Sequence, residues 1–226
     1  MAFDGIIFDF NGVLWWDTHL QQQAWAQFAS EVRGAPFSLE ELAVQVHGRN
    51  NRHTLEYLYG RKLSADEIGQ LTQKKETLYR RLCLDQGTEF RLSPGAINLL
   101  DFLVAHSVPH TIATASEKYN VDFFIHQLGL ANWFDISALV FDDGRLPGKP
   151  APDIYLLAAK RLRLAPARCI VVEDSRSGIL AAHAAGIGLV VALGPDATHA
   201  ELAKLPGVGL VVASLADLPK GLLKGQ

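Results

Sequence analysis

The chain has 226 residues, of which 49% are hydrophobic and 20% are charged, and its formal net charge is −3 at pH 7. This length and composition are typical of a globular protein with one sizeable core and a smaller additional domain. The weak negative charge argues against a nucleic-acid partner. No basic segment precedes an apolar N-terminal stretch, which argues against a signal peptide. No apolar run reaches roughly 18 residues, so we expect no membrane span.

Six short apolar runs predict β-strands. Several are apolar over their whole length, which is typical of parallel strands that helices cover on both faces. The predicted strands are Gly5–Phe10, His110–Ala115, Ile136–Phe141, Cys169–Glu173, Gly188–Leu193 and Gly209–Ala213. Helical patterns alternate with them: Ala96–Ala105, Asn120–Leu130, a helix from Pro152 to about Leu164, and Ser177–Ala185. The alternation predicts a doubly wound α/β domain with a mostly parallel, Rossmann-like sheet.

The segment 17–87 interrupts this alternation, because it contains no run typical of a strand. Two capping boxes, Ser38 with Glu41 and Ser64 with Glu67, predict the starts of helices. We therefore expect an inserted α-helical cap domain at 17–87 and a core domain made of 1–16 and 88–226. The basic pairs Lys74-Lys75 and Arg80-Arg81 are interpreted as the solvated face of a cap helix.

The two cysteines, Cys83 and Cys169, lie far apart and form no CxxC pair. We expect Cys169 to be a core residue of its strand, which fits a reducing, cytoplasmic environment.

Polar residues gather where the predicted strands end. They are Asp9 and Asn11, Thr114 with Ala115 and Ser116, Lys149, and Glu173 with Asp174. Each has an ordinary alternative role, as a helix cap, a strand residue or a surface lysine. Because the carboxyl ends of parallel strands meet at one edge of a sheet, we expect the group to converge there. Two carboxylates brought together need a cation between them, and oxygen ligands suit Mg²⁺. Lys149 and the Thr114 hydroxyl can then hold a tetrahedral anion, which indicates a phosphate site.

Four segments in this order, DFNGVL, TIATAS, GKPAPD and VVEDSRSGILAAHAAG, resemble the motifs of the haloacid dehalogenase superfamily of phosphohydrolases. With the inserted helical segment, the chain is similar to the β-phosphoglucomutase-like branch. The resemblance implies that Asp9 is the nucleophile that forms an aspartyl-phosphate. It also implies that Asp9, the Asn11 carbonyl, Glu173 and Asp174 form the Mg²⁺ site, and that Thr114, Ala115, Ser116 and Lys149 bind the phosphate.

The chain departs from this family at three positions. Phosphatases of the family have an aspartate at position 11 as general acid and base, and an amide cannot transfer a proton in this way. Mutases tend to have a threonine and a histidine where this chain has Asp17 and Gln21, which argues against mutase activity. Three hypotheses follow: a Mg²⁺-dependent phosphohydrolase slowed by Asn11, a non-catalytic phosphate-binding protein, or an active enzyme into which Asn11 was introduced.

The substrate is expected to be a small phosphorylated metabolite, such as a sugar phosphate. Arg49 and Arg52 follow Gly48 in the predicted cap. Their spacing of three residues allows them to share a helix face and bind a second anionic group, although a solvated helix start is an equal alternative. We expect a monomer or a weak dimer.

Overall fold

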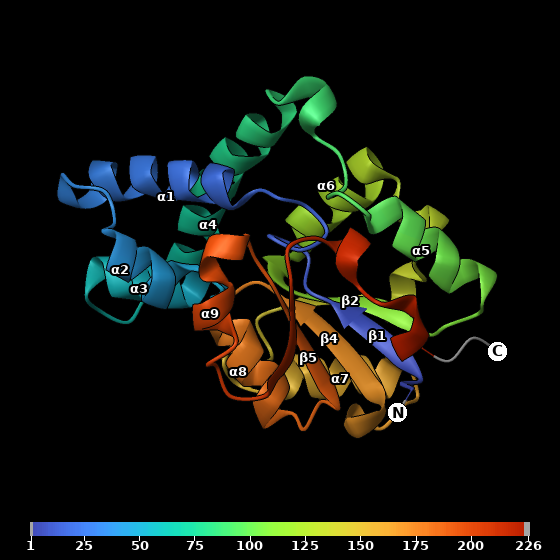
Figure 1. The fold of residues 1–226 in the computed structure, drawn as a ribbon. Helices are drawn as coiled ribbons and strands as arrows, with labels where there is room; N and C mark the ends of the chain where they lie inside the picture. Colours follow the sequence, from blue (N-terminus) through green and yellow to red (C-terminus); the bar gives the residue numbers. More distant parts are fainter. Residues whose placement is uncertain (1, 224–226) are drawn as a thin grey trace.

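The computed structural model describes residues 2–223, and its centre is a six-stranded sheet with the order β3-β2-β1-β4-β5-β6 (Figure 1). All neighbouring strands are parallel. The strands are β1 (Gly5–Phe8), β2 (His110–Glu117), β3 (Val140–Asp142), β4 (Cys169–Glu173), β5 (Leu189–Leu193) and β6 (Val208–Val212). The predicted fold class is thus confirmed. The strand order reverses between β1 and β4, and at such a point the carboxyl ends of a parallel sheet form a crevice.

The helices of the described chain are α1 (Thr18–Arg33), α2 (Leu39–Glu41), α3 (Asn51–Tyr59), α4 (Ala65–Leu84), α5 (Ala96–Ala105), α6 (Lys118–Leu128), α7 (Asp153–Arg161), α8 (Arg176–Ala184) and α9 (His199–Leu202). A π-helical turn, Leu42–Val46, continues α2.

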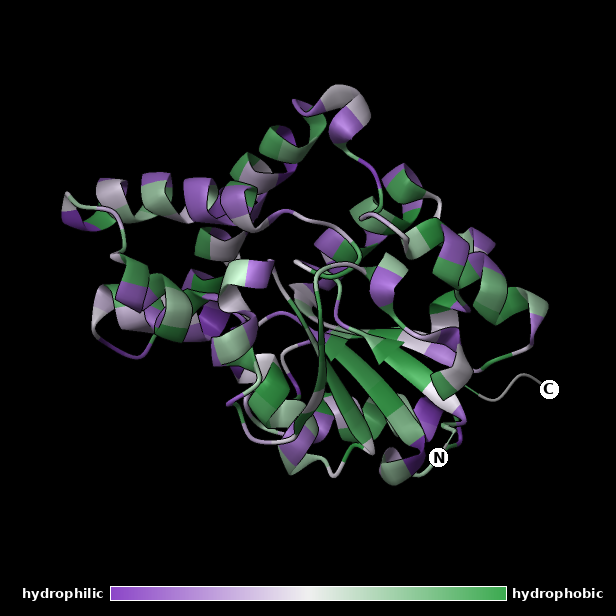
Figure 2. Ribbon diagram, viewed as in Figure 1, coloured by the Kyte–Doolittle hydropathy of each residue, from purple (hydrophilic) through white to green (hydrophobic). Residues whose placement is uncertain are grey.

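Helices cover both faces of the sheet. Ile6 and Phe8 of β1 pack in one hydrophobic cluster with residues of α5 and α6. Ile7 points to the other face and packs in a second cluster with residues of α7 and α8. β1, β4 and β5 accordingly consist almost entirely of apolar residues, whereas the covering helices present hydrophilic residues on their outer sides (Figure 2). Burial on both faces explains why apolar and polar residues do not alternate along these strands.

Several predicted boundaries are wrong by a few residues. The first strand ends at Phe8, because the Phe10 carbonyl accepts hydrogen bonds from the amides of Val13, Leu14 and Trp15 and so closes a turn. Residues 136–138 form a 3₁₀ turn, and β3 starts at Val140. The helix after Pro152 ends at Arg161, because the chain takes a positive φ of 59° at Arg163.

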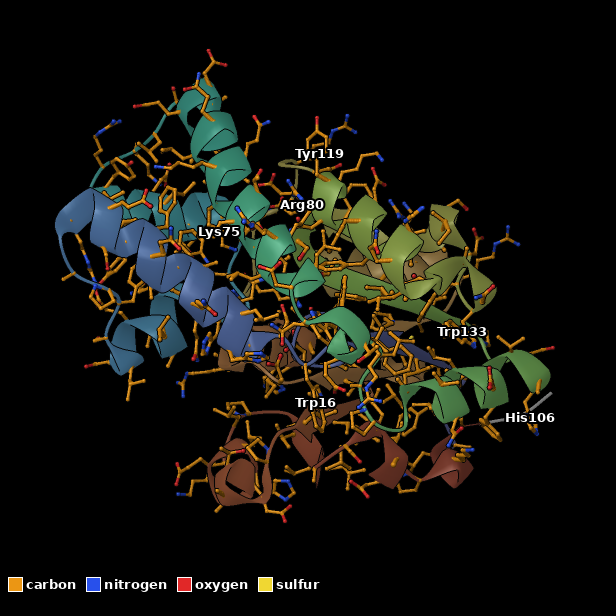
Figure 3. All side chains as sticks on the ribbon, turned by 90° about the horizontal axis from the view of Figure 1, so that it is seen from above. Trp16, Lys75, Arg80, His106, Tyr119 and Trp133 are labelled. Atoms are coloured by element: carbon orange, nitrogen blue, oxygen red, sulfur yellow. The ribbon has the colours of Figure 1, made fainter. Side chains whose placement is uncertain are left out.

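Helices α1–α4 form a helical insert between β1 and α5, and they have a hydrophobic cluster of their own that includes Trp25, Phe28 and Leu55. Both predicted capping boxes are confirmed: Ser38 precedes α2 and Glu41 is its third residue, and Ser64 precedes α4 and Glu67 is its third residue. In Figure 3 the insert lies beside α6, with α1 and α4 packed along each other.

Cys83 and Cys169 are both buried free thiols. Within residues 2–223, no helix combines the length and the apolar character that crossing a membrane requires.

Candidate active site

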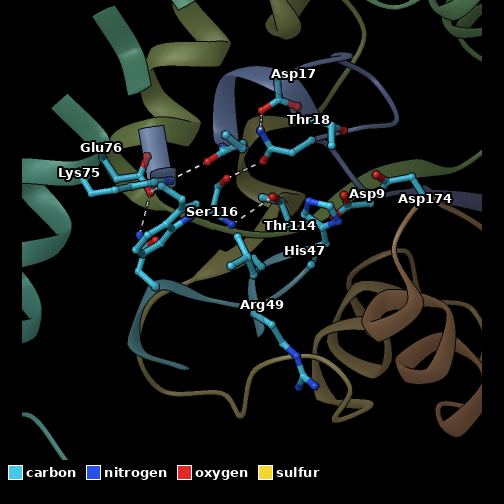
Figure 4. Close-up of a pocket in the computed structure, with 17 residues that line it drawn as sticks. Asp9, Asp17, Thr18, His47, Arg49, Lys75, Glu76, Thr114, Ser116 and Asp174 are labelled. Atoms are coloured by element: carbon cyan, nitrogen blue, oxygen red, sulfur yellow. Dashed lines mark hydrogen bonds and ion pairs between the residues drawn. The ribbon is translucent and has the colours of Figure 1, made fainter. Parts of the chain in front are cut away.

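The polar residues predicted at the strand ends meet at the crevice between the sheet and the helical insert. Asp9 follows β1, Thr114 lies in β2, and Asp174 follows β4. A cavity of about 80 Å³ lies over them (Figure 4). From the core it is lined by Asp9, Asn11, Thr114, Ala115, Ser116 and Asp174, and from the insert by residues that include Gln21, Trp25, Arg49, Asn51, Lys75 and Glu76. One cavity therefore joins the predicted nucleophile to a wall contributed by the insert.

Lys149 lies buried behind the nucleophile. Its Nζ donates to Asp9 Oδ1 at 2.7 Å, to Glu173 Oε1 at 2.6 Å and to the Ala113 carbonyl at 3.3 Å. Burial alone would lower the pKa of Lys149, but the charges of Asp9 and Glu173 raise it above its ordinary value. The side chain is therefore a permanent cation, fixed next to the Asp9 carboxylate.

The Glu173 carboxylate is fully used by hydrogen bonds. Besides Lys149, it accepts from the Tyr155 hydroxyl at 2.7 Å and from the Ser175 amide and hydroxyl at 2.9 and 3.0 Å. Gly178 makes room for it, because a Cβ at that position would overlap the carboxylate. These contacts orient Glu173 towards Lys149.

The ionised forms of Asp9 and Asp174 are unfavourable in this buried site. Burial raises the pKa of Asp9 to about 7, against the opposing charge of Lys149. Burial and the charges of Glu173, Asp9 and Asp17 raise the pKa of Asp174 well above its ordinary range. Oxygens of Asp9, Glu173 and Asp174 all lie within 4.8 Å of one another. Three carboxylates against one ammonium form an oxygen-rich site that a divalent cation would neutralise, so the residues fit Mg²⁺.

The loop after Asp9 approaches Asp174 closely. Gly12 has a φ of 83°, and a Cβ there would overlap the Asp174 carboxylate. A glycine is therefore required for Asp174 to reach the Asn11-Gly12 backbone.

The Asn11 side chain is held by a small network. Its Nδ2 donates to Asp17 Oδ2 at 2.7 Å and to the Tyr79 hydroxyl at 3.2 Å, and its Oδ1 accepts from the Ser116 hydroxyl at 2.7 Å. Asp17 also accepts from the Gly12 amide at 3.0 Å and from the Tyr79 hydroxyl. Burial raises the pKa of Asp17. This network was not predicted from the sequence, because Tyr79 lies 62 residues from Asp17.

The interpretation of the Lys74-Lys75 pair as a solvated face is wrong for Lys75. Only 2% of Lys75 is exposed, and it lines the cavity together with Glu76. The signal was present in the spacing, because Lys75 lies four residues from both Leu71 and Tyr79 and so falls on the inward face of α4.

Arg49 and Arg52 share one cavity, and only Arg49 also lines the cavity that contains Asp9. Arg49 lines the cavity, but its Nη1 donates to the Lys149 carbonyl at 2.8 Å, and Figure 4 shows the guanidinium pointing away from Asp9. Arg52 lies at a neighbouring cavity of about 520 Å³, which Arg49 also lines. The two do not share a helix face, since α3 begins only at Asn51.

The chain is similar to several known proteins. Residues 3–186 match the family described as haloacid dehalogenase-like hydrolase. The chain is 30% identical over 184 residues to the phosphorylated carbohydrates phosphatase of Thermotoga maritima, covering 81% of this chain and 82% of the relative. A hydrolase of family IA, variant 3, from Entamoeba histolytica HM-1:IMSS has a TM-score of 0.85 and 36% identity, over 97% of this chain and 96% of the other. A β-phosphoglucomutase from Clostridium difficile has a TM-score of 0.80 and 27% identity, over 97% and 94%.

Proposed function

The chain belongs to the haloacid dehalogenase-like hydrolases, in the β-phosphoglucomutase-like branch, and we propose that it is a Mg²⁺-dependent phosphatase with Asp9 as its nucleophile. Its substrate is a small phosphorylated metabolite. The name of the Thermotoga maritima relative supports a phosphorylated sugar.

The observation that carries the proposal is the placement of the Asp9 carboxylate between a fixed ammonium and the cavity. Lys149 occupies Asp9 Oδ1, so we assign the attack on phosphorus to Oδ2. The Oδ2–P bond forms as the bond from phosphorus to the leaving oxygen breaks, which yields an aspartyl-phosphate. Water then attacks phosphorus and releases Asp9 and inorganic phosphate.

Residues of β2 and the Lys149 ammonium would act on the phosphoryl group. Thr114 and Ser116 line the cavity with the Ala115 backbone between them, and the Thr114 hydroxyl and the Ala115 amide would donate hydrogen bonds to phosphoryl oxygens. The predicted Ser116 hydroxyl donates to Asn11 Oδ1 instead. Lys149 would hold the increased negative charge of the transition state near Asp9.

Asp9, Asp174 and the Asn11 carbonyl would hold the Mg²⁺ ion. The ion supplies positive charge that stabilises the phosphoryl oxygens during transfer. We assign Glu173 the role of orienting Lys149 instead of a direct ligand, because Lys149, Tyr155 and Ser175 already engage both of its oxygens.

Asn11 lowers the rate of the proposed reaction. The leaving alkoxide needs a proton and the attacking water must lose one, and the amide can do neither. The alternative is a phosphate-binding protein without turnover. Asp17 and Gln21, which stand where mutases tend to have a threonine and a histidine, argue against a mutase. We also propose that 17–87 acts as a cap over the core and that the protein is a monomer or a weak dimer.

The experiment compares the chain with Asp9→Asn in the Mg²⁺-dependent release of phosphate from a panel of sugar phosphates and from acetyl phosphate. We expect slow turnover that Asp9→Asn and EDTA both abolish. Mg²⁺ should also raise the melting temperature, by an amount equivalent to about 2.7 kcal/mol when its concentration is 100 times Kd. Phosphate binding without any turnover would instead identify a binding protein.

A further inference from the structure

A buried ion pair on α4 faces the cavity from the side opposite Asp9. Lys75 and Glu76 are 2% and 6% exposed, and Lys75 Nζ lies 2.9 Å from Glu76 Oε1. Figure 4 shows both side chains at the wall of the cavity that also contains Asp9 and Thr114. The phosphoryl transfer described above uses neither residue.

Hydrogen bonds fix the carboxylate of Glu76 in its ionised form. Oε1 accepts from Asn51 Nδ2 at 2.9 Å, and Oε2 accepts from Asn120 Nδ2 at 2.6 Å. Asn120 is oriented in turn by Arg80, which donates to its Oδ1 at 2.8 Å. Burial alone would raise the pKa of Glu76, but Lys75 and the two amides bring the pKa below its ordinary value.

The ammonium of Lys75 is largely used within the wall. It donates to Gln21 Oε1 at 2.6 Å as well as to Glu76, which takes two of its three N–H groups. It also lies 4.8 Å from the centre of the Trp25 ring. One remaining donor, a carboxylate that accepts hydrogen bonds and an indole ring suit hydroxyl groups and the C–H face of a polyol.

We propose that Glu76 selects the charge of the leaving group, so that the enzyme accepts monophosphates of neutral polyhydroxy compounds and rejects leaving groups with a second phosphate or a carboxylate. The inference rests on the proposed phosphatase function. Lys75 would by itself attract a second anion to the wall, but Glu76 cancels its charge. The paired wall therefore offers a second anion no net attraction, and an anion brought there would lose its hydration next to a buried carboxylate.

Arg49 does not restore a cation to this wall. Its guanidinium donates to the carbonyls of Lys149 and Val44 and points away from Asp9. The expectation that Arg49 and Arg52 bind a second anionic group is replaced here by selection against such a group.

The test compares kcat/KM for a hexose monophosphate and for the bisphosphate of the same hexose, with Mg²⁺ and with acetyl phosphate as a reference. The chain should prefer the monophosphate by at least about tenfold, since like-charge contacts cost several kcal/mol and 1.4 kcal/mol is tenfold. Glu76→Gln should reduce this preference by at least about tenfold, because its kcat/KM for the bisphosphate should rise. Glu117→Gln is the matched control, because Glu117 lies 3.4 Å from Asn51 but does not line the cavity.

Lys75→Gln should change the substrate preference in the direction opposite to Glu76→Gln. It leaves the Glu76 charge without its partner, so the preference for the monophosphate should increase. Equal kcat/KM of the unaltered protein for the two substrates would overturn the inference. A higher kcat/KM of Lys75→Gln for the bisphosphate would overturn it as well. Both outcomes can be measured even if Glu76→Gln does not fold. Loss of the proposed function has a different signature, because acetyl phosphate would then also remain intact.

Discussion

The backbone and the side chain of Asn11 have different roles in the proposed site, and an aspartate at this position would change only the role of the side chain. Its backbone carbonyl would be a ligand of the proposed Mg²⁺ site, while its side-chain amide donates to the Asp17 carboxylate at 2.7 Å. An aspartate at position 11 would place a second carboxylate against Asp17. Like charges at this distance raise the pKa of one member of the pair, which is what a general acid near neutral pH requires.

We expect Asn11→Asp to raise kcat on alkyl phosphates by at least ~10²-fold, because general acid–base catalysis is typically worth 10²–10⁴-fold. The gain on acetyl phosphate should be smaller, since its leaving group needs less protonation. Intact-mass analysis should accompany the assay, because Asn11-Gly12 can deamidate to aspartate. No gain on alkyl phosphates would exclude position 11 as the site of proton transfer.

The same variant should lose stability as the pH rises. A carboxyl group whose pKa is higher in the folded than in the unfolded protein destabilises the fold above the unfolded pKa of about 3.9. The difference in melting temperature between the unaltered protein and Asn11→Asp should therefore grow between pH 4 and pH 8. Asn11→Asp combined with Asp17→Asn should remove that growth, and a difference independent of pH would contradict the like-charge explanation.

Arg49 and Arg52 should differ in their effects on substrate binding. Arg49 connects the insert to the Lys149 carbonyl, and a hydrogen bond from a charged donor is worth about 1.5–3 kcal/mol. We expect Arg49→Ala to raise KM by roughly tenfold without changing Mg²⁺ affinity. Arg52 approaches Glu56 only to 3.9 Å, and such an exposed pair contributes little, so Arg52→Ala should change KM by less than about twofold. Equal effects of the two variants would contradict a specific role for the contact between Arg49 and the Lys149 carbonyl.

Helix α4 presents Lys75, Glu76 and Tyr79 to the site, and its start is fixed by a capping box. The Ser64 hydroxyl accepts from the Glu67 amide, and the Glu67 carboxylate accepts from the Ser64 amide. These two bonds satisfy backbone groups that otherwise lack partners at a helix N-terminus.

Ser64→Ala should lower the free energy of unfolding by about 1 kcal/mol, the usual contribution of a serine N-cap. The measurement is the urea midpoint at constant m-value. Ser30→Ala is the control: its hydroxyl bonds to the Ala26 carbonyl on an exposed stretch of α1, and its loss should stay within about 0.5 kcal/mol. Equal losses would mean that the capping box contributes nothing specific.

The insert and the core make a close backbone contact at Gly48. Gly48 has a φ of 67°, and a Cβ there would overlap the hydroxyls of Ser175 and Ser177. The Ser177 hydroxyl also donates to the His47 carbonyl at 2.9 Å. At the other end, the two segments that connect the insert to the core are tied together, because Ser93 bonds to the carbonyls of Val13 and Leu14. We expect the insert to rotate about these segments.

Gly48→Ala should prevent full closure and lower kcat/KM by up to ~10²-fold, since a displacement of about 1 Å at an active site can cost this much. Gly60→Ala is a matched control, because Gly60 has a φ of 65° but no atom within 4 Å of its added Cβ. Both variants should lose similar stability from the strained backbone, and only Gly48→Ala should increase the radius of gyration measured with a bound phosphate analogue. Equal kinetic losses would attribute the effect to backbone strain alone.

The sequence by itself determined the fold class, the helical insert and the group of residues at the strand ends. Apolar runs mark strands buried on both faces, and the residues that follow such runs, including Asp9, Thr114 and Asp174, must meet at one edge of a parallel sheet. These conclusions depend on spacing along the chain, which the sequence records directly.

Only the tertiary structure decided which charges are paired and what each pair faces. Lys75 belongs to a basic run, yet it is buried because α4 turns it towards Trp25 and Gln21 of α1. The amide of Asn11 donates hydrogen bonds to Asp17 and Tyr79. The carboxylate of Glu173 accepts hydrogen bonds from Lys149 and Tyr155. The state of a buried charge depends on the groups that other elements bring within a few ångströms, and spacing along the chain does not specify those groups.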